Sequence, residues 1–375
     1  MRLAVLGASV VIITTIGIAH QKGIPVVGVD ALCPFGGIET LWSLILSATL
    51  VQRIAASSVV LLAIVIATAL VFRRAFCGYI CPLGAIQEFA GKLGLALFHT
   101  KRPTLSAALD RPARFLKYAV LVVFTVWTWQ AATLVIRPYD PWVAWMHLTS
   151  PELLSSFSVG LAILVLSLLG SIVYDRFFCK YLCPMGAFLG AISRASLFKV
   201  RRNAATCTNC KACDKVCPVN VDVSTVEVVN DAECINCNEC VNVCPVQETL
   251  TVSTGGVAKR ALKPNTVLWI TVAVIAAALG LTTLTGTFAW TMPSLAKTAE
   301  KAGGTINPED IKGSMSFEEI AKVTGISGEA FREKFGVSEA EMTQPIKDLA
   351  GKYGFDVHTD VREFVAEKLG QNPNP

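Results

Sequence analysis

Charged residues are scarce in this chain, and histidine is nearly absent. Asp, Glu, Lys and Arg make up 16% of its 375 residues, and only four residues are histidines, whereas globular chains average about 25% charged residues. Hydrophobic residues make up 53%, and the mean hydropathy is +0.54. This composition argues against a disordered chain and against a purely cytosolic enzyme. His20 and His147 do not lie well inside any apolar stretch, so a bis-histidine haem is disfavoured.

Long uncharged stretches take the place of the missing charge. A helix that spans a bilayer needs about 17–25 apolar residues. Five stretches approach that length: Leu3 to Ala19, Ile54 to Phe72, Tyr118 to Ile136, Leu153 to Tyr174 and Val267 to Trp290. Five of them in one chain predict a polytopic membrane protein rather than buried core helices. Because Gly17-Ile18-Ala19 resembles a small-residue cleavage site, a signal peptide is the alternative for the first stretch.

Lys and Arg residues predict the side of the membrane that each loop faces. With the N-terminus inside, the inner segments carry 20 Lys and Arg residues, and the outer segments before residue 290 carry three. Cytoplasmic loops are rich in Lys and Arg, so residues 73–117 and 176–265 are expected on the cytoplasmic side of a bacterial inner membrane. The acidic tail then lies outside. The apolar stretch from Ile38 to Val51 contains Glu39 and predicts an outer-surface or re-entrant helix.

Twelve of the thirteen cysteines lie on the predicted inner side, where reducing conditions favour metal ligation over disulfides. Two runs have the spacing C-x2-C-x2-C-x3-C-P, which is typical of bacterial two-cluster ferredoxins. In that pattern the fourth cysteine of each run binds the cubane of the other run. The predicted [4Fe–4S] ligand sets are Cys207, Cys210, Cys213 and Cys244 for one cluster, and Cys234, Cys237, Cys240 and Cys217 for the second. Two zinc sites are the alternative, but zinc sites usually show separated C-x2-C pairs.

An internal repeat carries the other four inner cysteines. VFRRAFCGYICPLGAIQEF and VYDRFFCKYLCPMGAFLGA align at a shift of 102 residues. Each half has two predicted spans followed by C-x3-C-P-x-G, with Cys77 and Cys81 in the first half and Cys179 and Cys183 in the second. Because both halves cross the membrane in the same direction, a pseudo-two-fold axis along the membrane normal is expected.

Each C-x3-C-P pair supplies two ligands, which is too few for a cubane. Brought together by the pseudo-symmetry, Cys77, Cys81, Cys179 and Cys183 supply the four ligands of one shared [4Fe–4S] cluster, which is the favoured interpretation. The alternatives are that each pair recruits two ligands from elsewhere, forms a redox dithiol, or is a structural pair of thiols. No unassigned cysteine remains on the inner side, which disfavours two extra clusters. Arg74 and Arg176 are expected to offset the negative charge of the cluster.

Cys33 is the one cysteine on the predicted outer side, in the segment DALCPFGGIET. It has no outer partner for an intramolecular disulfide. It is a ligand, a thiol near a quinone, or a small buried apolar residue. The last interpretation is favoured, because free cysteine often behaves in this way.

The polar tail predicts a small helical domain. Ser316 with Glu319, and Ser338 with Glu341, resemble capping boxes. Helix stops are expected at Gly325, Gly336 and Gly370. Residues 316–336 resemble a helix-turn-helix, but the acidic charge and the outer location argue against nucleic acid as a partner. The tail contains no cysteine, so it is expected to dock a partner or cap the protein rather than to bind a cluster.

The two C-x3-C-P motifs together with the tandem ferredoxin runs resemble the membrane polyferredoxins. This family includes the quinol-oxidising membrane subunit of periplasmic nitrate reductase and the nitrous-oxide reductase regulatory protein. The resemblance covers about residues 1–290 and does not extend to the tail. Nothing in the tail resembles a flavin-attachment region. The outer immunoglobulin-like domain of the related cytochrome oxidase assembly polyferredoxins does not match a tail that is expected to be helical.

These observations predict an α-helical polytopic membrane protein with about five transmembrane helices and an internal two-fold repeat. A bacterial-type 2[4Fe–4S] ferredoxin-like insert of α+β structure and a small helical C-terminal domain complete the fold. The expected divisions are a first membrane repeat at residues 1–92, a second at 93–199, the ferredoxin-like domain at 200–256, the fifth transmembrane helix at 264–292 and the outer domain at 293–375.

The resemblance implies that the protein is an iron–sulfur electron-transfer subunit of a membrane respiratory complex rather than a stand-alone enzyme. It implies electron transfer between the quinone pool, or an inner reductant, and an outer redox partner such as a flavin- or haem-containing subunit. A quinone is then a further cofactor. The alternative is a maturation or regulatory protein that supplies electrons for metal or cofactor assembly of a respiratory enzyme.

Overall fold

The fold comes from a computed structural model that describes residues 1–22, 32–47, 56–98, 107–131, 135–150, 153–254, 261–288 and 315–370, with isolated positions between these ranges. Two compact units make up the chain. The first consists of Met1–Gln21 with Val27–Trp290, and the second of Lys22–Val26 with Thr291–Pro375. The first unit contains all thirteen cysteines.

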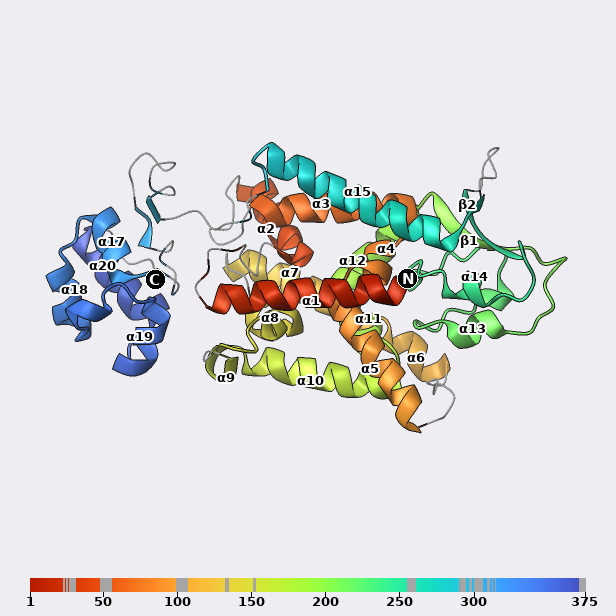
Figure 1. The fold of residues 1–375 in the computed structure, drawn as a ribbon, viewed down its shortest axis with the longest axis horizontal. Coiled ribbons are helices and arrows are strands. Elements are labelled where there is room, and N and C mark those ends of the chain that lie inside the picture. Colours follow the sequence, from red (N-terminus) through yellow and green to blue (C-terminus); the bar gives the residue numbers. More distant parts are fainter. Residues whose placement is uncertain are drawn as a thin grey trace. The chain divides into compact units, whose positions relative to one another are not determined.

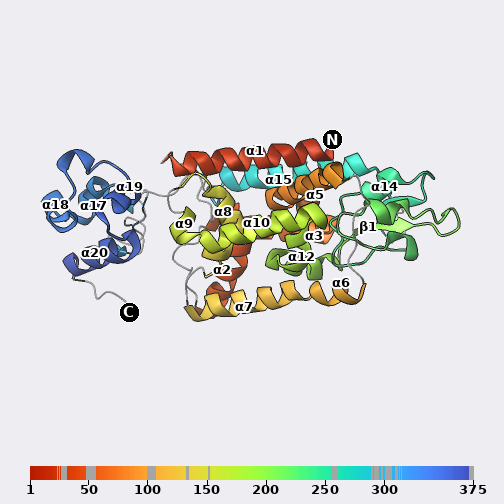
Figure 2. The ribbon, with the colours of Figure 1, turned by 90° about the horizontal axis from the view of Figure 1, so that it is seen from below.

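Helices form most of the first unit (Figure 1). Before the first motif they are α1 (Arg2–Gln21), α2 (Pro34–Ser47) and α3 (Ala56–Phe72). Between the motifs they are α6 (Ala107–Ala113), α7 (Leu116–Ala131), α8 (Pro141–Met146), α9 (Leu153–Ser156) and α10 (Ser158–Val173). The last long helix is α15 (Pro264–Leu284). In Figure 2, α1 and α15 lie on one side of this unit and α7 lies on the opposite side.

The two motifs have the same local structure. In each, a long apolar helix is followed by a five-residue helix and then by a helix that begins at the proline of the motif. These elements are α3, α4 (Ala75–Tyr79) and α5 (Pro82–Phe98) in the first repeat, and α10, α11 (Phe177–Tyr181) and α12 (Pro184–Ser193) in the second. Proline favours the first position of a helix, because its fixed φ suits a helix and its missing N–H would have no partner there. The C-P dipeptide therefore places the second cysteine of each motif at a helix N-terminus.

The ferredoxin-like part joins the end of the helical layer near the N-terminus in both views (Figures 1 and 2). Strand β1 (Phe198–Arg202) pairs antiparallel with β2 (Leu250–Thr254), which also pairs with β3 (Ala261–Leu262). Between β1 and β2 lie the short helices α13 (Ala212–Val216) and α14 (Glu239–Val243). A valine-rich core fills the space between the sheet and these helices.

The expected spans are present as helices, but their lengths differ. Among the described residues, α1 and α15 have at least 18 residues and are apolar enough to cross a membrane. Helices α3, α7 and α10 have 17, 16 and 16 residues. The stretch expected from Leu153 to Tyr174 is interrupted at Phe157, whose buried ring packs against His147 with the ring centroids 4.5 Å apart. The long helices therefore support membrane association, and five full-length spans remain a hypothesis.

The second unit is helical and has its own core. Its helices are α17 (Phe317–Thr324), α18 (Gly328–Phe335), α19 (Ile346–Tyr353) and α20 (Arg362–Lys368), with a π-helical turn at Val357–Val361. The Ser316 hydroxyl accepts a hydrogen bond from the N–H of Glu319, and Ser338 with Glu341 forms a capping box. Gly325 and Gly336 end α17 and α18 with positive φ. The predicted helix signals are confirmed at these positions.

Candidate cofactor sites

The eight cysteines of the ferredoxin-like part line two cavities. One is bordered by Cys217, Cys234, Cys237 and Cys240. The other is bordered by Cys207, Cys210, Cys213 and Cys244. The fourth cysteine of each run thus lies with the first three cysteines of the other run, which is the grouping that the spacing predicted.

The left-handed backbone of several asparagines shapes these loops. Asn209, Asn220, Asn236 and Asn238 have φ between 52° and 60°, a conformation that asparagine adopts more readily than most residues. Asn238 precedes α14 and Asn236 lies within the second run, so the chain turns sharply between successive cysteines. Neighbouring thiols therefore point into one space from a short segment.

The spacing of the thiols does not fit single metal ions. Among the residues that the structure describes, no three His, Cys, Asp or Glu side chains are close enough together to hold one ion. A tetrahedral zinc ion would draw its sulfur ligands to about 2.3 Å from one centre. Four thiolates that bind four different irons of a cubane stand farther apart. The donor set of four cysteines at each cavity suits a [4Fe–4S] cluster.

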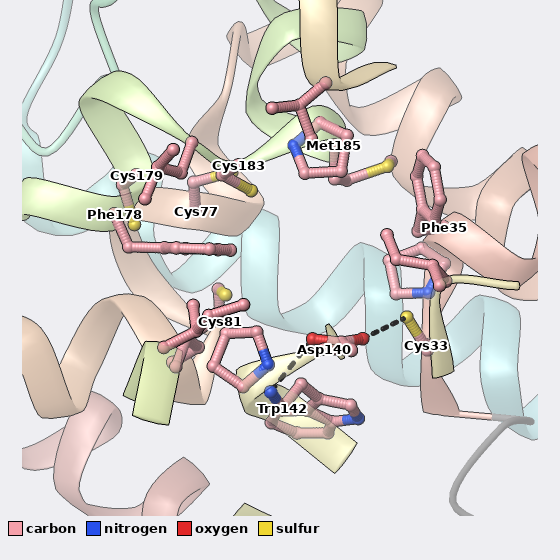
Figure 3. A pocket seen from close by; sticks show the side chains of 18 of the residues that line it. Cys33, Phe35, Cys77, Cys81, Asp140, Trp142, Phe178, Cys179, Cys183 and Met185 are labelled. Atoms are coloured by element: carbon pink, nitrogen blue, oxygen red, sulfur yellow. Dashed lines mark hydrogen bonds between the residues drawn. The ribbon is translucent and has the colours of Figure 1, made fainter. Parts of the chain in front are cut away.

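The four cysteines of the C-x3-C-P motifs line a third cavity of about 310 Å³, which is almost entirely apolar. In Figure 3, Cys77, Cys81, Cys179 and Cys183 gather on one side of this cavity, around the ring of Phe178. The thiols are close enough to influence one another, because Cys77 and Cys179 both help to raise the pKa of the Cys81 thiol. The two repeats therefore contribute to one site.

Each motif presents its second thiol to backbone N–H groups. The sulfur of Cys183 accepts a hydrogen bond from the N–H of Gly186 at 3.3 Å. Burial, with the neighbouring Cys77 and Cys179, nevertheless raises the pKa of Cys81 to about 12, and burial raises the pKa of Cys183 well above its usual range. Bound iron would favour the thiolate form at these positions.

One side chain of the first repeat reaches the motif of the second. Gln87, on α5, donates from its Nε2 to the sulfur of Cys179 at 3.4 Å. Its Oε1 accepts from the N–H of Phe178 at 2.9 Å. Gln87 is fully buried, so it fixes the first motif cysteine of the second repeat from across the repeat boundary. The sequence alignment did not identify Gln87, because the second repeat has Leu189 at the equivalent position.

Two buried carboxylates bind the arginines that lie next to the four-cysteine site. Glu88 binds Arg2 at 2.5 Å and Arg176 at 2.8 Å. Burial alone raises the pKa of Glu88, but Arg176 and Arg2 outweigh this effect and lower the pKa to about 2. Glu233, in the second ferredoxin run, binds Arg74 at 3.4 Å and also binds Lys117. The available sequence signal for Glu88 was that it is the one charged residue between Arg74 and Lys92.

The ferredoxin-like part packs directly on the first motif. A Cβ added at Gly78 would overlap the carbonyl oxygen of Ile235 and would lie 3.6 Å from the Cα of Cys237. The Nδ2 of Asn238 donates to the hydroxyl of Tyr79 at 2.8 Å. The four-cysteine cavity and the cavity bordered by Cys237 are therefore separated by little more than two backbone segments.

Cys33 also lines the four-cysteine cavity, on the side opposite the motif thiols (Figure 3). Its sulfur donates to Oδ2 of Asp140 at 3.8 Å. Both residues precede the proline that begins a short helix, namely Pro34 of α2 and Pro141 of α8. The distribution of Lys and Arg predicted Cys33 on the outer side, and it did not point to Asp140. The dipeptides Cys-Pro and Asp-Pro, each in the segment between the first two long helices of its repeat, were the signal that could have linked them.

Trp142 provides a donor at the same end of the cavity. Its side chain is 8% exposed, and its indole N–H is buried without a hydrogen-bond partner among the described residues. Asp140 accepts a hydrogen bond from the backbone N–H of Trp142 at 2.9 Å through Oδ1. This end of the cavity thus contains a carboxylate and a thiol in otherwise apolar surroundings, with the Trp142 ring beside them.

Two protein-family models match the chain. A 4Fe-4S binding domain matches at residues 54–104 and again at 158–203, and a 4Fe-4S dicluster domain matches residues 199–245. The first model thus matches once on each repeat, over the segments that carry the C-x3-C-P motifs. No solved structure shows significant similarity to the chain.

Several curated proteins are similar to the chain. YccM of Escherichia coli strain K12, whose provisional name describes an electron transport protein, is 31% identical over 199 residues, covering 52% of this chain and 55% of YccM. The uncharacterized protein MJ0750 of Methanocaldococcus jannaschii is 33% identical over 194 residues, covering 52% of this chain and 75% of that protein. The ferredoxin-type protein NapH of Escherichia coli strain K12 is 32% identical over 155 residues, covering 40% of this chain and 49% of NapH. The chain therefore spans about half the length of YccM and of NapH.

The contact between Gly78 and Ile235 generates a first prediction. Replacing Gly78 with Ala should separate the ferredoxin-like part from the first motif, because the added methyl group meets rigid backbone. We expect increased protease cleavage within residues 200–254 and loss of bound iron in the purified protein. Gly280→Ala is the matched control, since nothing lies within 4 Å of a Cβ at Gly280. Equal behaviour of the two variants would contradict the close contact.

Proposed function

Since the chain belongs to the NapH-like family of membrane polyferredoxins, we propose that it is an iron–sulfur electron-transfer subunit of a membrane respiratory complex. In this role it connects the quinone pool, or an inner reductant, with an outer redox partner. The observation that carries the proposal is the single cavity to which both repeats contribute C-x3-C-P cysteines, next to the ferredoxin-like part.

We assign twelve cysteines as ligands of three [4Fe–4S] clusters. Cys77, Cys81, Cys179 and Cys183 hold the shared cluster. Cys217, Cys234, Cys237 and Cys240 hold the second, and Cys207, Cys210, Cys213 and Cys244 hold the third. When bound, such clusters supply one-electron oxidation and reduction at a potential set by charge, hydrogen bonds and exposure. The three cavities and their lining residues support this assignment.

We propose that the three cluster sites form a series for electron transfer. Contact between Gly78 and Ile235 brings the four-cysteine site close to the site of Cys237. Cys240 and Cys213 are buried in the shared core of the ferredoxin-like part, whereas Cys210 is exposed. A series that begins inside the helical layer and ends at an exposed loop suits electron exchange between a membrane-dissolved molecule and a soluble carrier.

We propose that the quinone ring binds at the Cys33 end of the four-cysteine cavity. This cavity has a volume of about 310 Å³, whereas each ferredoxin-type cavity has a volume of about 20 Å³. The four-cysteine cavity is therefore much larger than the two cavities that are assigned to clusters alone. The space beyond that needed by a cluster is apolar, which suits the ring and its lipid-soluble tail. The carboxylate of Asp140 is suited to accept the proton of a hydroquinone hydroxyl, and the indole N–H of Trp142 is suited to bind a ring carbonyl.

We further propose that the first unit crosses the membrane about five times and that the clusters lie on the cytoplasmic side. Large apolar side chains are exposed on α7 and α10 as well as on α1 and α15; they include Val11, Val122, Val123, Leu166, Leu169, Val274 and Leu281. Such faces suit lipid. Helices of 16 or 17 residues are close to the lower limit of about 17 for a span. The division at residues 92, 199, 256 and 293 is retained as part of this proposal.

Cysteine replacement tests the shared cluster. We expect Cys77→Ala and Cys179→Ala each to remove the same cluster, about four of about twelve irons per chain. The double variant should lose no more iron than either single variant, because both cysteines bind one group. Iron and acid-labile sulfide in purified protein provide the measurement, and Cys33→Ala should retain full iron content. Additive losses would contradict a shared cluster.

Replacement of Asp140 tests the quinone site. Asp140→Asn keeps a side chain that can cap α8 but removes the proton acceptor. We expect the wild-type iron content, with reduction by an added hydroquinone slowed at least tenfold, since a positioned base contributes about 10²–10⁴-fold. Stopped-flow absorbance of the bound clusters measures the rate. Asp222→Asn, at an exposed aspartate of the ferredoxin-like part, should leave the rate unchanged; an unchanged rate in Asp140→Asn would exclude Asp140.

Protease accessibility tests the orientation. We expect protease added to spheroplasts to remove the acidic tail after about residue 290, because that segment is placed outside by the distribution of Lys and Arg. The membrane fraction should retain its iron after this cut. Inverted vesicles should instead lose the ferredoxin-like part, which is placed inside. Protection of the tail in spheroplasts would overturn the proposed orientation.

A further inference from the structure

The two arginines that precede the motifs are exchanged between the repeats. Arg74 lies three residues before Cys77, and Arg176 lies three residues before Cys179. Yet Nη1 of Arg176 donates to the backbone carbonyl of Cys77 at 2.7 Å, in the first motif. The guanidinium of Arg176 thus binds the motif of the opposite repeat.

The glycines of the motifs mark where the guanidinium groups lie. A Cβ added at Gly84, in the first motif, would lie 2.8 Å from Nη1 of Arg176. A Cβ added at Gly186, in the second motif, would lie 2.8 Å from Nη2 of Arg74. The arrangement is reciprocal, so each C-x3-C-P-x-G motif contains glycine where the arginine of the other repeat enters.

Both arginines are buried. Arg74 is 2% exposed and Arg176 is 0% exposed. Each shares a buried carboxylate with a second cation: Glu233 with Lys117 for Arg74, and Glu88 with Arg2 for Arg176. Two cations on one carboxylate leave positive charge on each side of the four-cysteine site. Glu239 also binds Arg2, but it is 31% exposed and lies at the edge of this network.

A buried positive charge without a full counter-charge is costly unless another negative group lies nearby. Four thiolates around a [4Fe–4S] core carry net negative charge, and one-electron reduction makes the group more negative. Arg74 lines the cavity that contains the four thiols. Positive charge fixed next to such a group favours its reduced form.

We propose that Arg74 and Arg176 are positioning residues exchanged between the repeats: each binds into the opposite C-x3-C-P motif, joins the two motifs into one site and raises the reduction potential of the cluster held there. This inference rests on the proposed four-cysteine site. Neither residue is a ligand, and both act through the cysteines and backbone that they contact. Gly84 and Gly186 are the positions that admit the two guanidinium groups.

Stability cycles test the exchange without any cluster. In apo protein purified in detergent, Gly84→Ala should lower the Tm, because the methyl group displaces Arg176. Adding Gly84→Ala to an Arg176→Ala background should lower the Tm no further, whereas adding it to an Arg74→Ala background should produce the full loss. The reverse pattern is expected for Gly186→Ala. Equal losses in both backgrounds would overturn the exchange, whatever the number of clusters.

Redox titration tests the effect on potential. We expect Arg176→Gln to lower the midpoint potential of one cluster so that its reduced-to-oxidised ratio falls at least tenfold at a given potential, which is 59 mV for a one-electron couple. Arg176→Lys should restore most of the shift, because it restores the charge. Electron paramagnetic resonance during the titration separates this cluster from the other two.

Arg73→Gln is the matched control. Arg73 is also buried, but its guanidinium binds the carbonyl of Asp231 at 2.5 Å and the side chain of Asn230 rather than a motif. We expect no shift in that variant. An equal shift in Arg73→Gln, or none in Arg176→Gln, would overturn the proposed effect on the potential. Iron content of wild-type protein separately tests whether the third cluster exists, so failure of that assignment is distinguishable from failure of this one.

Discussion

The need to balance buried charge determines the centre of this structure. Thiols, arginines and glutamates meet within an apolar helical layer, where an unmatched charge is costly. Glu88 and Glu233 each bind two cations, and the remaining positive charge faces four cysteines. Around this set of charges lie the short helices α4 and α11, the first residues of α5 and α12, and the ferredoxin-like part.

The same interactions connect the parts of the first unit. Arg2, at the start of α1, donates to the carbonyl of Gly78 at 3.0 Å and binds Glu88. Glu233 belongs to the ferredoxin-like part, but its cations come from the helical layer. Because the charge balance of one part depends on the other, the four-cysteine cavity and the ferredoxin-type cavities form a continuous system rather than independent modules.

The segments between the first two long helices of each repeat have a parallel role. Cys33 and Asp140 directly precede the first residues of α2 and α8 and contact each other within the four-cysteine cavity. Both repeats therefore contribute residues to the opposite end of the cavity as well as to the motif end. The two residues differ chemically, because the first repeat supplies the thiol of Cys33 and the second supplies the carboxylate of Asp140. The carboxylate gives that end of the cavity an acid–base group.

The sequence by itself determined the local features of this protein. Ligand spacing predicted how the ferredoxin cysteines are grouped, because a fourth cysteine after three residues points away from its own loop. Serine and glycine positions predicted the helix ends of the tail, because capping depends on residues only three or four apart. Hydropathy identified α1, α3, α7, α10 and α15, but it did not identify α5, which is as long as α3. Only the tertiary structure decided which distant groups meet. The exchange of Arg74 and Arg176, the reach of Gln87 to Cys179 and the pairing of Cys33 with Asp140 join residues about 90 to 110 positions apart. Such contacts depend on how the repeats pack, and no periodicity or spacing along one segment encodes that packing.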